Sequence, residues 1–277
     1  MTDIGYLILR VLARDQISDI YSTGGPSHMT FEDHTMFSLP LDQHQGSRSN
    51  AVLNRLADLI SEGQLVAGDM LPPESELAAR FKVSKPTVRE AMRKLEMMGV
   101  IEIVHGRGSS IRRISAEPLQ FFLRLAVGSL DRGIAEIIEF RRAIEVSAAG
   151  LAAENGTEQQ FAELKQMMTR MQAAAAEHDT WVAWDLAFHA HIAAMTGNTL
   201  MSFMVEAMRP IMQQSISMLH GQKQMRDAQK TLERHVAIAE AIGNRDATAA
   251  QAAMQIHFDA SVPVAISLVA QDRKGND

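Results

Sequence analysis

Four side chains in the C-terminal half of the sequence belong to types that bind divalent metal ions. Asp185 and His189 stand four residues apart in an apolar segment, and His235 and His257 lie in two later segments with helical periodicity. Because four residues make roughly one helical turn, the carboxylate and the imidazole project from one face and could share a cation. Three imidazoles and one carboxylate suit zinc, nickel or a comparable divalent ion with open coordination positions. Taken singly, each histidine is better explained as an ordinary core or surface residue, and spacing alone leaves both interpretations of the Asp185–His189 pair open.

The elements that must position these ligands form a run of helices beyond Pro118. Apolar residues there recur at helical spacing, and short turns separate the periodic segments. We expect a kink at Pro210 and a kink or break at Pro263, since proline removes a helical hydrogen bond. The pattern predicts an all-α antiparallel bundle of six or seven helices. The expected helices cover Leu119–Ser129, Gly133–Glu154, Thr157–Glu177, Asp179–Thr196, Thr199–Leu219, Arg226–Ile242 and Asp246–Val269.

A second constellation, between Leu71 and Glu96, has the chemistry of nucleic-acid recognition. The pattern predicts a helix over Glu74–Phe81, a tight turn, and a second helix whose N-terminus is capped by Ser84. Apolar residues follow at spacings of three and four in this second helix, so its basic and hydroxyl-bearing residues remain on other faces. A helix with a buried stripe and a basic N-terminal end suits the DNA major groove, where its first residues reach base edges.

The segment after these helices predicts a β-hairpin. Val100–Val104 is β-branched, His105–Gly108 has turn composition and a basic character, and Ser109–Arg112 is a second extended run. Two helices followed by a hairpin make a winged helix-turn-helix of α+β type, whose first helix we expect at Ala51–Gly63. The alternative is a small α+β interaction module with a solvated charged face.

Many positions in this region stand at the spacing of a known family: Leu53–Ile60, Gly63-Gln64-Leu65, Gly68-Asp69, Leu71-Pro72, Glu76-Leu77-Ala78, Val83-Ser84, Val88-Arg89-Glu90-Ala91, Leu95 and Gly106-Arg107-Gly108. The stretch from Ser49 to Ile114 therefore resembles the DNA-binding domain of the GntR family of transcription regulators. The resemblance implies that the turn into the recognition helix, the first residues of that helix and the wing contact double-stranded DNA. The matching positions are Ser84, Lys85, Thr87, Arg89, His105, Gly106 and Arg107. The family often has arginine at the position of Lys85, and some of its members have another arginine at the position of Ser75. Lysine offers a point charge and not the bidentate fork with which arginine contacts guanine.

A second set of positions also stands at family spacing: Glu139-Phe140-Arg141, Asp185-x3-His189, and the helices of His235 and His257. Over residues 119–270 the chain resembles the FCD effector domain of the FadR subfamily. The resemblance implies that the aspartate and the three histidines hold a divalent metal ion, with zinc or nickel as the expected metal. It also implies that Arg141 binds a small carboxylate effector, for which a planar guanidinium offers bidentate geometry. The alternative for Arg141, as for the adjacent Arg142, is a solvated charge.

Charge is distributed unevenly along the chain. The protein carries a formal net charge of −6, but residues 48–115 hold 11 lysines and arginines against 8 carboxylates, whereas the remainder holds 16 against 25. A locally basic domain still presents positive potential to DNA. The absence of cysteine excludes disulfides, thiolate catalysis and cysteine-type zinc fingers, and it fits a reducing cytoplasm. No apolar run approaches the ~20 residues of a membrane helix, so we expect no membrane partner.

These patterns divide the chain into parts with different expected roles. Residues 1–47 read as a mostly disordered extension, which is either a functional arm or the product of a mis-assigned start with translation beginning at Met29 or Met36. The parts that follow are 48–114 for the winged helix-turn-helix, 115–118 for a hinge, 119–270 for an effector-binding and dimerisation bundle, and 271–277 for a tail.

The sequence thus predicts a mainly α, cytoplasmic, sequence-specific transcription regulator and not an enzyme. It would bind a palindromic operator as a homodimer, because one recognition helix spans few base pairs. It would act as a repressor that a small organic acid or sugar acid releases. One alternative is a metal-dependent hydrolase with a DNA-binding appendage, but no general base stands out near the candidate ligands. The other alternative is a structural protein that coats DNA, but the effector bundle would serve no purpose in such a protein.

Overall fold

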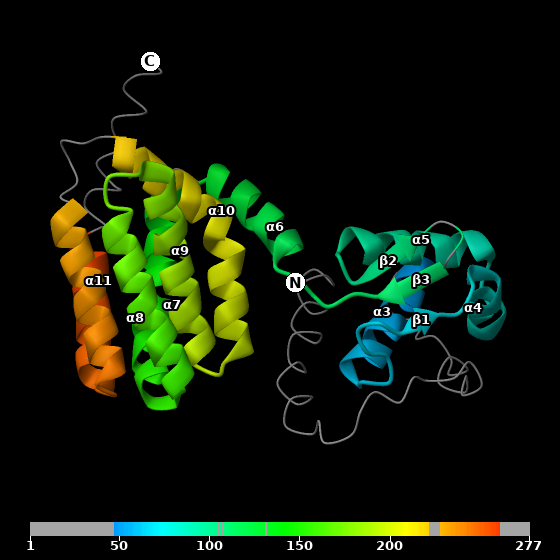
Figure 1. Cartoon of the computed structure of the whole chain (residues 1–277). Coiled ribbons are helices and arrows are strands. Elements are labelled where there is room, and N and C mark those ends of the chain that lie inside the picture. Colours follow the sequence, from blue (N-terminus) through cyan, green and yellow to red (C-terminus); the bar gives the residue numbers. More distant parts are fainter. Residues whose placement is uncertain (1–46, 105, 107, 131, 222–227, 261–277) are drawn as a thin grey trace, which may run out of the picture. The chain divides into compact units, whose positions relative to one another are not determined.

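The computed structural model describes residues 47–104, 106, 108–130, 132–221 and 228–260, and Figure 1 draws the remainder as a thin trace. The chain divides into two compact units, Met1–Pro118 and Leu119–Asp277. Most of the expected N-terminal extension, the expected interruption at Pro263 and the tail at 271–277 lie outside the described residues.

The first unit is a small α+β domain. Its helices are α3 (Arg48–Ser61), α4 (Glu74–Phe81) and α5 (Lys85–Met97), and its strands are β1 (Met70–Leu71), β2 (Ile101–Val104) and β3 (Gly108–Ile111), as labelled in Figure 1. The strands form an antiparallel sheet in the order β1-β3-β2. This arrangement confirms the expected winged helix-turn-helix. The strand β1 was not expected, because two residues are too few to produce a period.

Capping residues fix where these helices begin. The hydroxyl of Ser84 accepts a hydrogen bond from the backbone N–H of Thr87 at 3.4 Å, so α5 begins where the sequence predicts. The helix α3 begins at Arg48, three residues before the expected Ala51, because Ser47 caps it in the same way by accepting from Asn50. The expected apolar stripe of α5 is buried, and so is the apolar face of α3. The fully buried side chains of this core include Val52, Leu56, Leu59, Leu77, Val88 and Leu95.

The second unit consists of helices throughout its described part, which confirms the expected all-α bundle. They are α6 (Glu117–Gly128), α7 (Gly133–Asn155), α8 (Glu158–Ala173), α9 (His178–Met195), α10 (Thr199–Gly221), α11 (Ala228–Gly243) and a last described helix over residues 247–260. The helices pack side by side (Figure 1) around a core that includes Trp181, Phe188 and Met208. The first turn of α6 takes in Glu117 and Pro118, which the sequence had assigned to the hinge, because proline is tolerated in a first turn.

The helix α8 begins with a capping box. The Thr157 hydroxyl accepts from the backbone N–H of Gln160, and the Gln160 side chain accepts from the backbone N–H of Thr157 at 2.9 Å. The helix nevertheless ends at Ala173, four residues before the expected Glu177. Ala174 caps this end, where its backbone N–H donates to the carbonyl oxygens of Arg170 and Gln172, and the chain then makes a short connection into α9.

The helix α10 continues through Pro210 from Thr199 to Gly221. Proline has no N–H, so the carbonyl of Glu206, four residues earlier, loses its helical donor. The side-chain amide of Gln120, on α6, donates to that carbonyl at 3.1 Å. The helix therefore continues because a neighbouring helix supplies the missing hydrogen bond.

Replacing Gln120 by alanine is expected to lower the free energy of unfolding by about 0.5–1.5 kcal/mol, the usual net contribution of one hydrogen bond. Guanidinium denaturation of the full chain, followed by circular dichroism, measures the difference. The control is a Pro210→Ala background, in which residue 210 regains its own N–H. There the Gln120 substitution should have much less effect, and an equal loss in both backgrounds would show that Gln120 does not act through this carbonyl.

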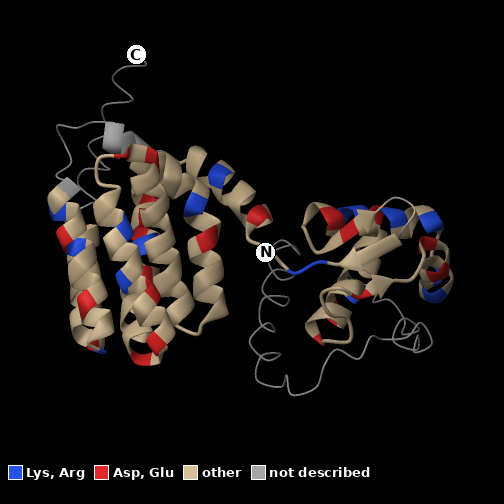
Figure 2. Cartoon of the chain, viewed as in Figure 1, with Lys and Arg blue, Asp and Glu red and all other residues tan. Residues whose placement is uncertain are grey.

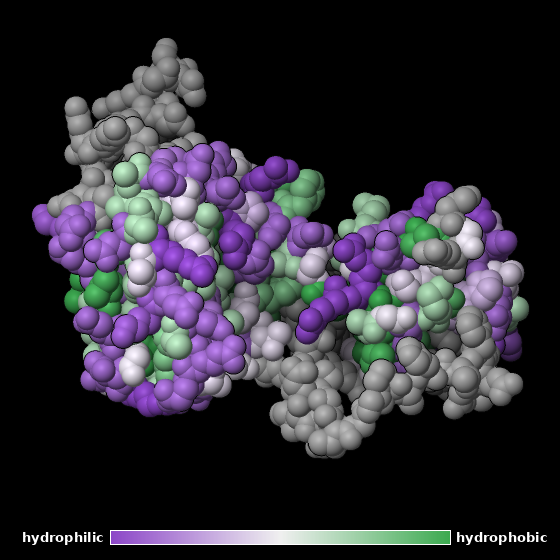
Figure 3. All heavy atoms as spheres, viewed as in Figure 1, coloured by the Kyte–Doolittle hydropathy of each residue, from purple (hydrophilic) through white to green (hydrophobic). Residues whose placement is uncertain are grey.

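None of the described helices is both long and apolar enough to span a membrane. The visible face of the bundle is mostly hydrophilic with scattered apolar residues (Figure 3).

Candidate functional site

Four helices of the bundle bring the candidate metal ligands and a buried arginine to one place. Asp185 and His189 come from α9, His235 from α11 and His257 from the helix over residues 247–260. All four side chains are buried. Among the described residues, one group has ligand atoms that all lie within 4.8 Å of one another, and it consists of the three histidines. Asp185 lies beside this group and contacts His235, with Oδ1 3.2 Å from Nε2.

The orientation of His235 is fixed by its backbone. Its Nδ1–H donates to the carbonyl oxygen of Thr231, one turn earlier on α11, at 2.8 Å. In a neutral imidazole the other nitrogen, Nε2, then carries a lone pair. That lone pair faces the Asp185 carboxylate, and such a contact is favourable only when a cation is present, either a proton on Nε2 or a metal ion. The geometry fits a metal ligand whose second nitrogen is held by a carbonyl.

His189 is held in a similar way by a carboxylate that the sequence analysis did not single out. Nδ1 of His189 pairs with Oε2 of Glu145, and Oε1 of Glu145 pairs with Nε of Arg141, so the three groups form a fully buried chain. This pairing leaves Nε2 of His189 among the buried atoms without a hydrogen-bond partner in the described part of the chain. Two of the three histidines therefore have one nitrogen occupied by a supporting group and the other available as a ligand.

Burial and neighbouring charges set the ionisation of the cluster. Burial alone would raise the pKa of Asp185, but His235, His189 and Arg141 outweigh it and hold that pKa well below its usual value. Burial disfavours the imidazolium form, so the pKa of His257 lies well below its usual value and that of His189 is also lowered. An ionised carboxylate at Asp185 and uncharged imidazoles at His189 and His257 are the protonation states that metal binding requires.

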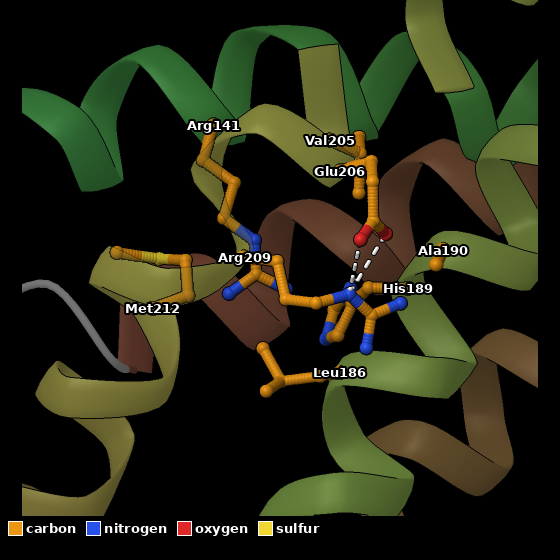
Figure 4. Close-up of a pocket in the computed structure, with 8 residues that line it drawn as sticks. All are labelled: Arg141, Leu186, His189, Ala190, Val205, Glu206, Arg209 and Met212. Atoms are coloured by element: carbon orange, nitrogen blue, oxygen red, sulfur yellow. Dashed lines mark hydrogen bonds and ion pairs between the residues drawn. The ribbon is translucent and has the colours of Figure 1, made fainter. Parts of the chain in front are cut away.

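Of the two adjacent arginines on α7, Arg141 points into the protein and Arg142 does not. Arg141 is 5 % exposed, and its Cζ lies 5.4 Å from the centre of the Phe258 ring. Arg142 is partly exposed, and its Nη2 lies 3.0 Å from Oδ1 of Asp259. Arg141 and His189 also line a narrow pocket at the edge of the cluster (Figure 4), whose enclosed space is about that of one water molecule. Its remaining lining residues are Leu186, Ala190, Val205, Glu206, Arg209 and Met212.

His191, two residues beyond His189, lies outside the cluster. Its Nε2–H donates to the carbonyl oxygen of Gln160 on α8 at 3.0 Å. His189 and His191 thus have separate environments although they are only two residues apart.

The candidate DNA-binding residues of the first unit lie at the start of α5. Ser84, Lys85 and Arg89 are exposed, and Thr87 is half-buried because its hydroxyl contacts that of Ser84 at 2.8 Å. Lysines and arginines lie along α5 with carboxylates between them, and α4 also carries both kinds of charge (Figure 2). The exposed residues at the N-terminal end of α5 therefore include cationic and hydroxyl groups that could contact phosphates or base edges.

Arg89 is held by a carboxylate from the preceding helix. Its Nε donates to both carboxylate oxygens of Glu74, at 3.1 and 3.3 Å, and its Nη2 donates to one of them at 3.0 Å. Glu74 and Arg89 lie 15 positions apart on different helices, so the sequence pattern does not reveal that they pair. The pair fixes the guanidinium on the exposed side of α5.

The wing has a backbone that only glycine adopts readily. Gly106 and Gly108 have φ angles of +77° and +100°, in the left-handed region. A Cβ at Gly108 would also lie 3.2 Å from the methyl group of Met70 in β1. The other two candidate wing residues, His105 and Arg107, lie outside the described residues.

Two sequence families match the two units. The family described as bacterial regulatory proteins, gntR family, matches residues 48–111, and the FCD domain matches residues 136–260. A winged helix-turn-helix followed by this helical domain defines the class of DNA-binding transcription regulators. The chain belongs to the GntR family of these regulators and carries an FCD domain.

Individual relatives agree with this assignment. The chain is 31% identical to the HTH-type transcriptional regulator YcbG of Bacillus subtilis over 208 residues, which are 75% of this chain and 85% of that protein. It is 30% identical to the HTH-type transcriptional repressor NanR of Klebsiella aerogenes over 221 residues, 76% of this chain and 82% of that one. Among solved structures, the chain is similar to Streptococcus agalactiae GntR, with a TM-score of 0.61, 29% identity, and coverage of 78% of this chain and 99% of that one. These families and relatives are regulators and not enzymes, which disfavours the hydrolase alternative.

Proposed function

We propose that the protein is a dimeric transcriptional repressor that a small organic acid or sugar acid releases from its operator. The observation that carries this proposal is the buried cluster of three histidines and Asp185 next to the buried guanidinium of Arg141. In a bundle attached to a DNA-binding domain, such a cluster is a site for a regulatory ligand. The NanR relative is named as a repressor, which supports the same direction of control.

The buried charges around the histidine cluster favour the binding of a divalent cation and, once it is bound, the binding of an anion. With neutral imidazoles, the buried groups are the carboxylates of Asp185 and Glu145 and the guanidinium of Arg141, so one negative charge is not compensated. An uncompensated charge in a protein interior costs on the order of several kcal/mol. A bound divalent cation would change the net charge of these buried groups from one negative to one positive charge. A bound carboxylate would then neutralise that positive charge.

Asp185, His189, His235 and His257 would hold the metal, and zinc or nickel suits this mixture of imidazole and carboxylate ligands. Thr231 and Glu145 support the proposal, because each occupies the second nitrogen of one histidine. When bound, the metal supplies a positive anchor for the oxygen atoms of an acid. Arg141 would supply a second one, since its Nε is engaged by Glu145 and its terminal nitrogens have no hydrogen-bond partner within the described residues. The ligand class that fits is a small 2-hydroxy carboxylate.

For the DNA-binding unit, we propose that Ser84, Lys85, Thr87 and Arg89 contact the operator from the major groove. Gly106 and its neighbours His105 and Arg107 would contact the flanking backbone or minor groove. The exposure of the first residues of α5 and the left-handed conformation of the wing glycine support this assignment. A palindromic operator then requires a homodimer, which sedimentation analysis of the purified chain would detect. A regulator of this kind acts in the cytoplasm.

The direct test uses the metal-loaded full chain and its operator, identified by selecting tight-binding duplexes from a random library. Fluorescence anisotropy would follow operator release during titration with 2-hydroxy acids. We expect release by at least one such acid and no release after the metal has been removed with a chelator. Operator affinity that no acid changes would contradict the proposal.

Replacing Glu74 by glutamine should reduce the discrimination between operator and unrelated DNA. The substitution removes a negative charge beside the DNA-binding face and weakens the hold on the Arg89 guanidinium. Affinity for unrelated DNA should therefore rise by roughly three- to tenfold, without an equal rise for the operator. Anisotropy titrations of both duplexes at fixed salt measure the ratio, with Glu76→Gln, on the same helix, as the control. A ratio unchanged from wild type would mean that Glu74 does not orient Arg89 on DNA.

A further inference from the structure

A second arginine lies in the narrow pocket beside the histidine cluster, and the proposed function leaves it without a role. Arg141 enters the pocket from α7 and Arg209 enters it from α10, and His189 of α9 lies between these helices (Figure 4). The pocket therefore has a guanidinium on two of its walls. His189 is the candidate metal ligand among the residues that line this pocket.

The two arginines differ in how firmly they are held. Arg141 is buried and paired with the buried Glu145, whereas the side chains of Arg209 and Glu206 are 35% and 42% exposed. Nε of Arg209 donates to both carboxylate oxygens of Glu206, at 2.9 and 2.7 Å. Its terminal nitrogens have no hydrogen-bond partner among the described residues. An ion pair this exposed contributes little to stability, so another carboxylate can replace Glu206 at small cost.

The pocket must widen before an organic acid can enter, and Arg209 is the less firmly held of its two arginines. The enclosed space holds about one water molecule, which is too small for an organic acid. Arg141 cannot easily leave its buried partner, but Arg209 is at the solvent side and stands directly before Pro210. Glu206, once released, remains in contact with water because it is itself half exposed.

We propose that Arg209 is a second carboxylate-binding residue and that the effector is a diacid. One carboxylate of the effector binds at Arg141, and the other replaces Glu206 on Arg209. This inference rests on the proposed function, because it takes the first carboxylate site as given. It narrows the ligand class from 2-hydroxy acids in general to 2-hydroxy acids with a second carboxylate.

Paired acids that differ by one terminal carboxylate test the inference. Isothermal titration calorimetry of the metal-loaded full chain would compare lactate with malate, and gluconate with glucarate. We expect the diacid of at least one pair to bind at least about tenfold more tightly than its monoacid. Arg209→Gln should remove that difference by weakening the diacid and leaving the monoacid within about twofold. Glu206→Gln should tighten the diacid, because the competing carboxylate is gone.

The controls separate this inference from the proposed function. Arg142→Gln removes an equal charge from an arginine outside the pocket and should change neither affinity. Arg141→Gln should weaken monoacid and diacid together. Monoacids that bind as tightly as diacids, or an Arg209→Gln variant that weakens both equally, would overturn the inference and leave the proposed function standing. Failure of all four acids to bind the wild-type chain would overturn both.

Discussion

Replacing Arg89 by alanine is expected to raise the Kd for the operator by roughly two to four orders of magnitude, because the contact is lost in both half-sites of a dimer. Arg89 lies on the exposed face of α5, one turn beyond Lys85, and Glu74 fixes its guanidinium there. The measurement is an anisotropy or gel-shift titration at physiological salt. Circular dichroism and sedimentation of the variant should match the wild type, since the side chain lies outside the core.

The control for this variant is Arg142→Ala, which removes the same charge from a partly exposed position in the bundle. Its operator affinity should stay near that of the wild type. Wild-type affinity in the Arg89 variant would show that α5 is not the recognition helix.

His235→Ala is expected to lower metal affinity by more than the roughly 10- to 100-fold loss typical of removing a group that only orients a metal ligand. Nε2 of His235 faces Asp185, and its Nδ1 is already held by Thr231, so the substitution deletes a ligand and not a supporting contact. The variant should bind the acid weakly and remain on the operator when the acid is added. Metal analysis after dialysis and titration calorimetry with the acid give the two readouts.

His191→Ala is the matched control, because His191 is an imidazole on α9 that donates to Gln160 and not to the cluster. It should keep metal content and acid response unchanged. His235 is fully buried, so a thermal-unfolding scan must accompany the variant, and His257→Gln provides a second route to the same result. Unchanged metal content with unchanged acid affinity in both histidine variants would refute the metal site.

Sequence periodicity predicted the elements well where one face of a helix is apolar. In α5 the stripe of Val88, Ala91, Met92 and Leu95 is buried as expected, and Ser84 caps the helix. Local signals of this kind involve residues within one or two turns. The strand β1, by contrast, is defined by pairing of Met70 and Leu71 with Ser110 and Ser109, residues far along the chain.

Inside the bundle, periodicity could not decide which polar residues face inward. The helix α7 has apolar side chains on several faces, among them Ile137, Ile138, Ile144 and Val146, so Arg141 and Arg142 could each have been the buried one. The spacing of Arg141 and Glu145, one turn apart, was visible in the sequence and could have identified the buried pair. What the sequence lacks is the position of His189 on another helix, which makes Glu145 part of the same chain of contacts.

The Pro210 region shows the same dependence on distant residues. A proline in the middle of a helical pattern removes one backbone donor, and neighbouring residues do not show what replaces it. Gln120 lies 86 positions earlier and supplies the missing donor to Glu206, so the helix continues. Only the packing of α6 against α10 reveals this compensation.

The central claim is that ligand binding in the bundle and operator binding by the winged domain are coupled, and reciprocity gives its most direct test. If the acid weakens operator binding by some factor, the operator must weaken acid binding by the same factor. Titration calorimetry would measure the Kd of the acid for the metal-loaded chain, alone and saturated with operator. We expect a weaker acid affinity in the complex, by the factor measured for operator release. Equal affinities with and without operator would contradict the coupling.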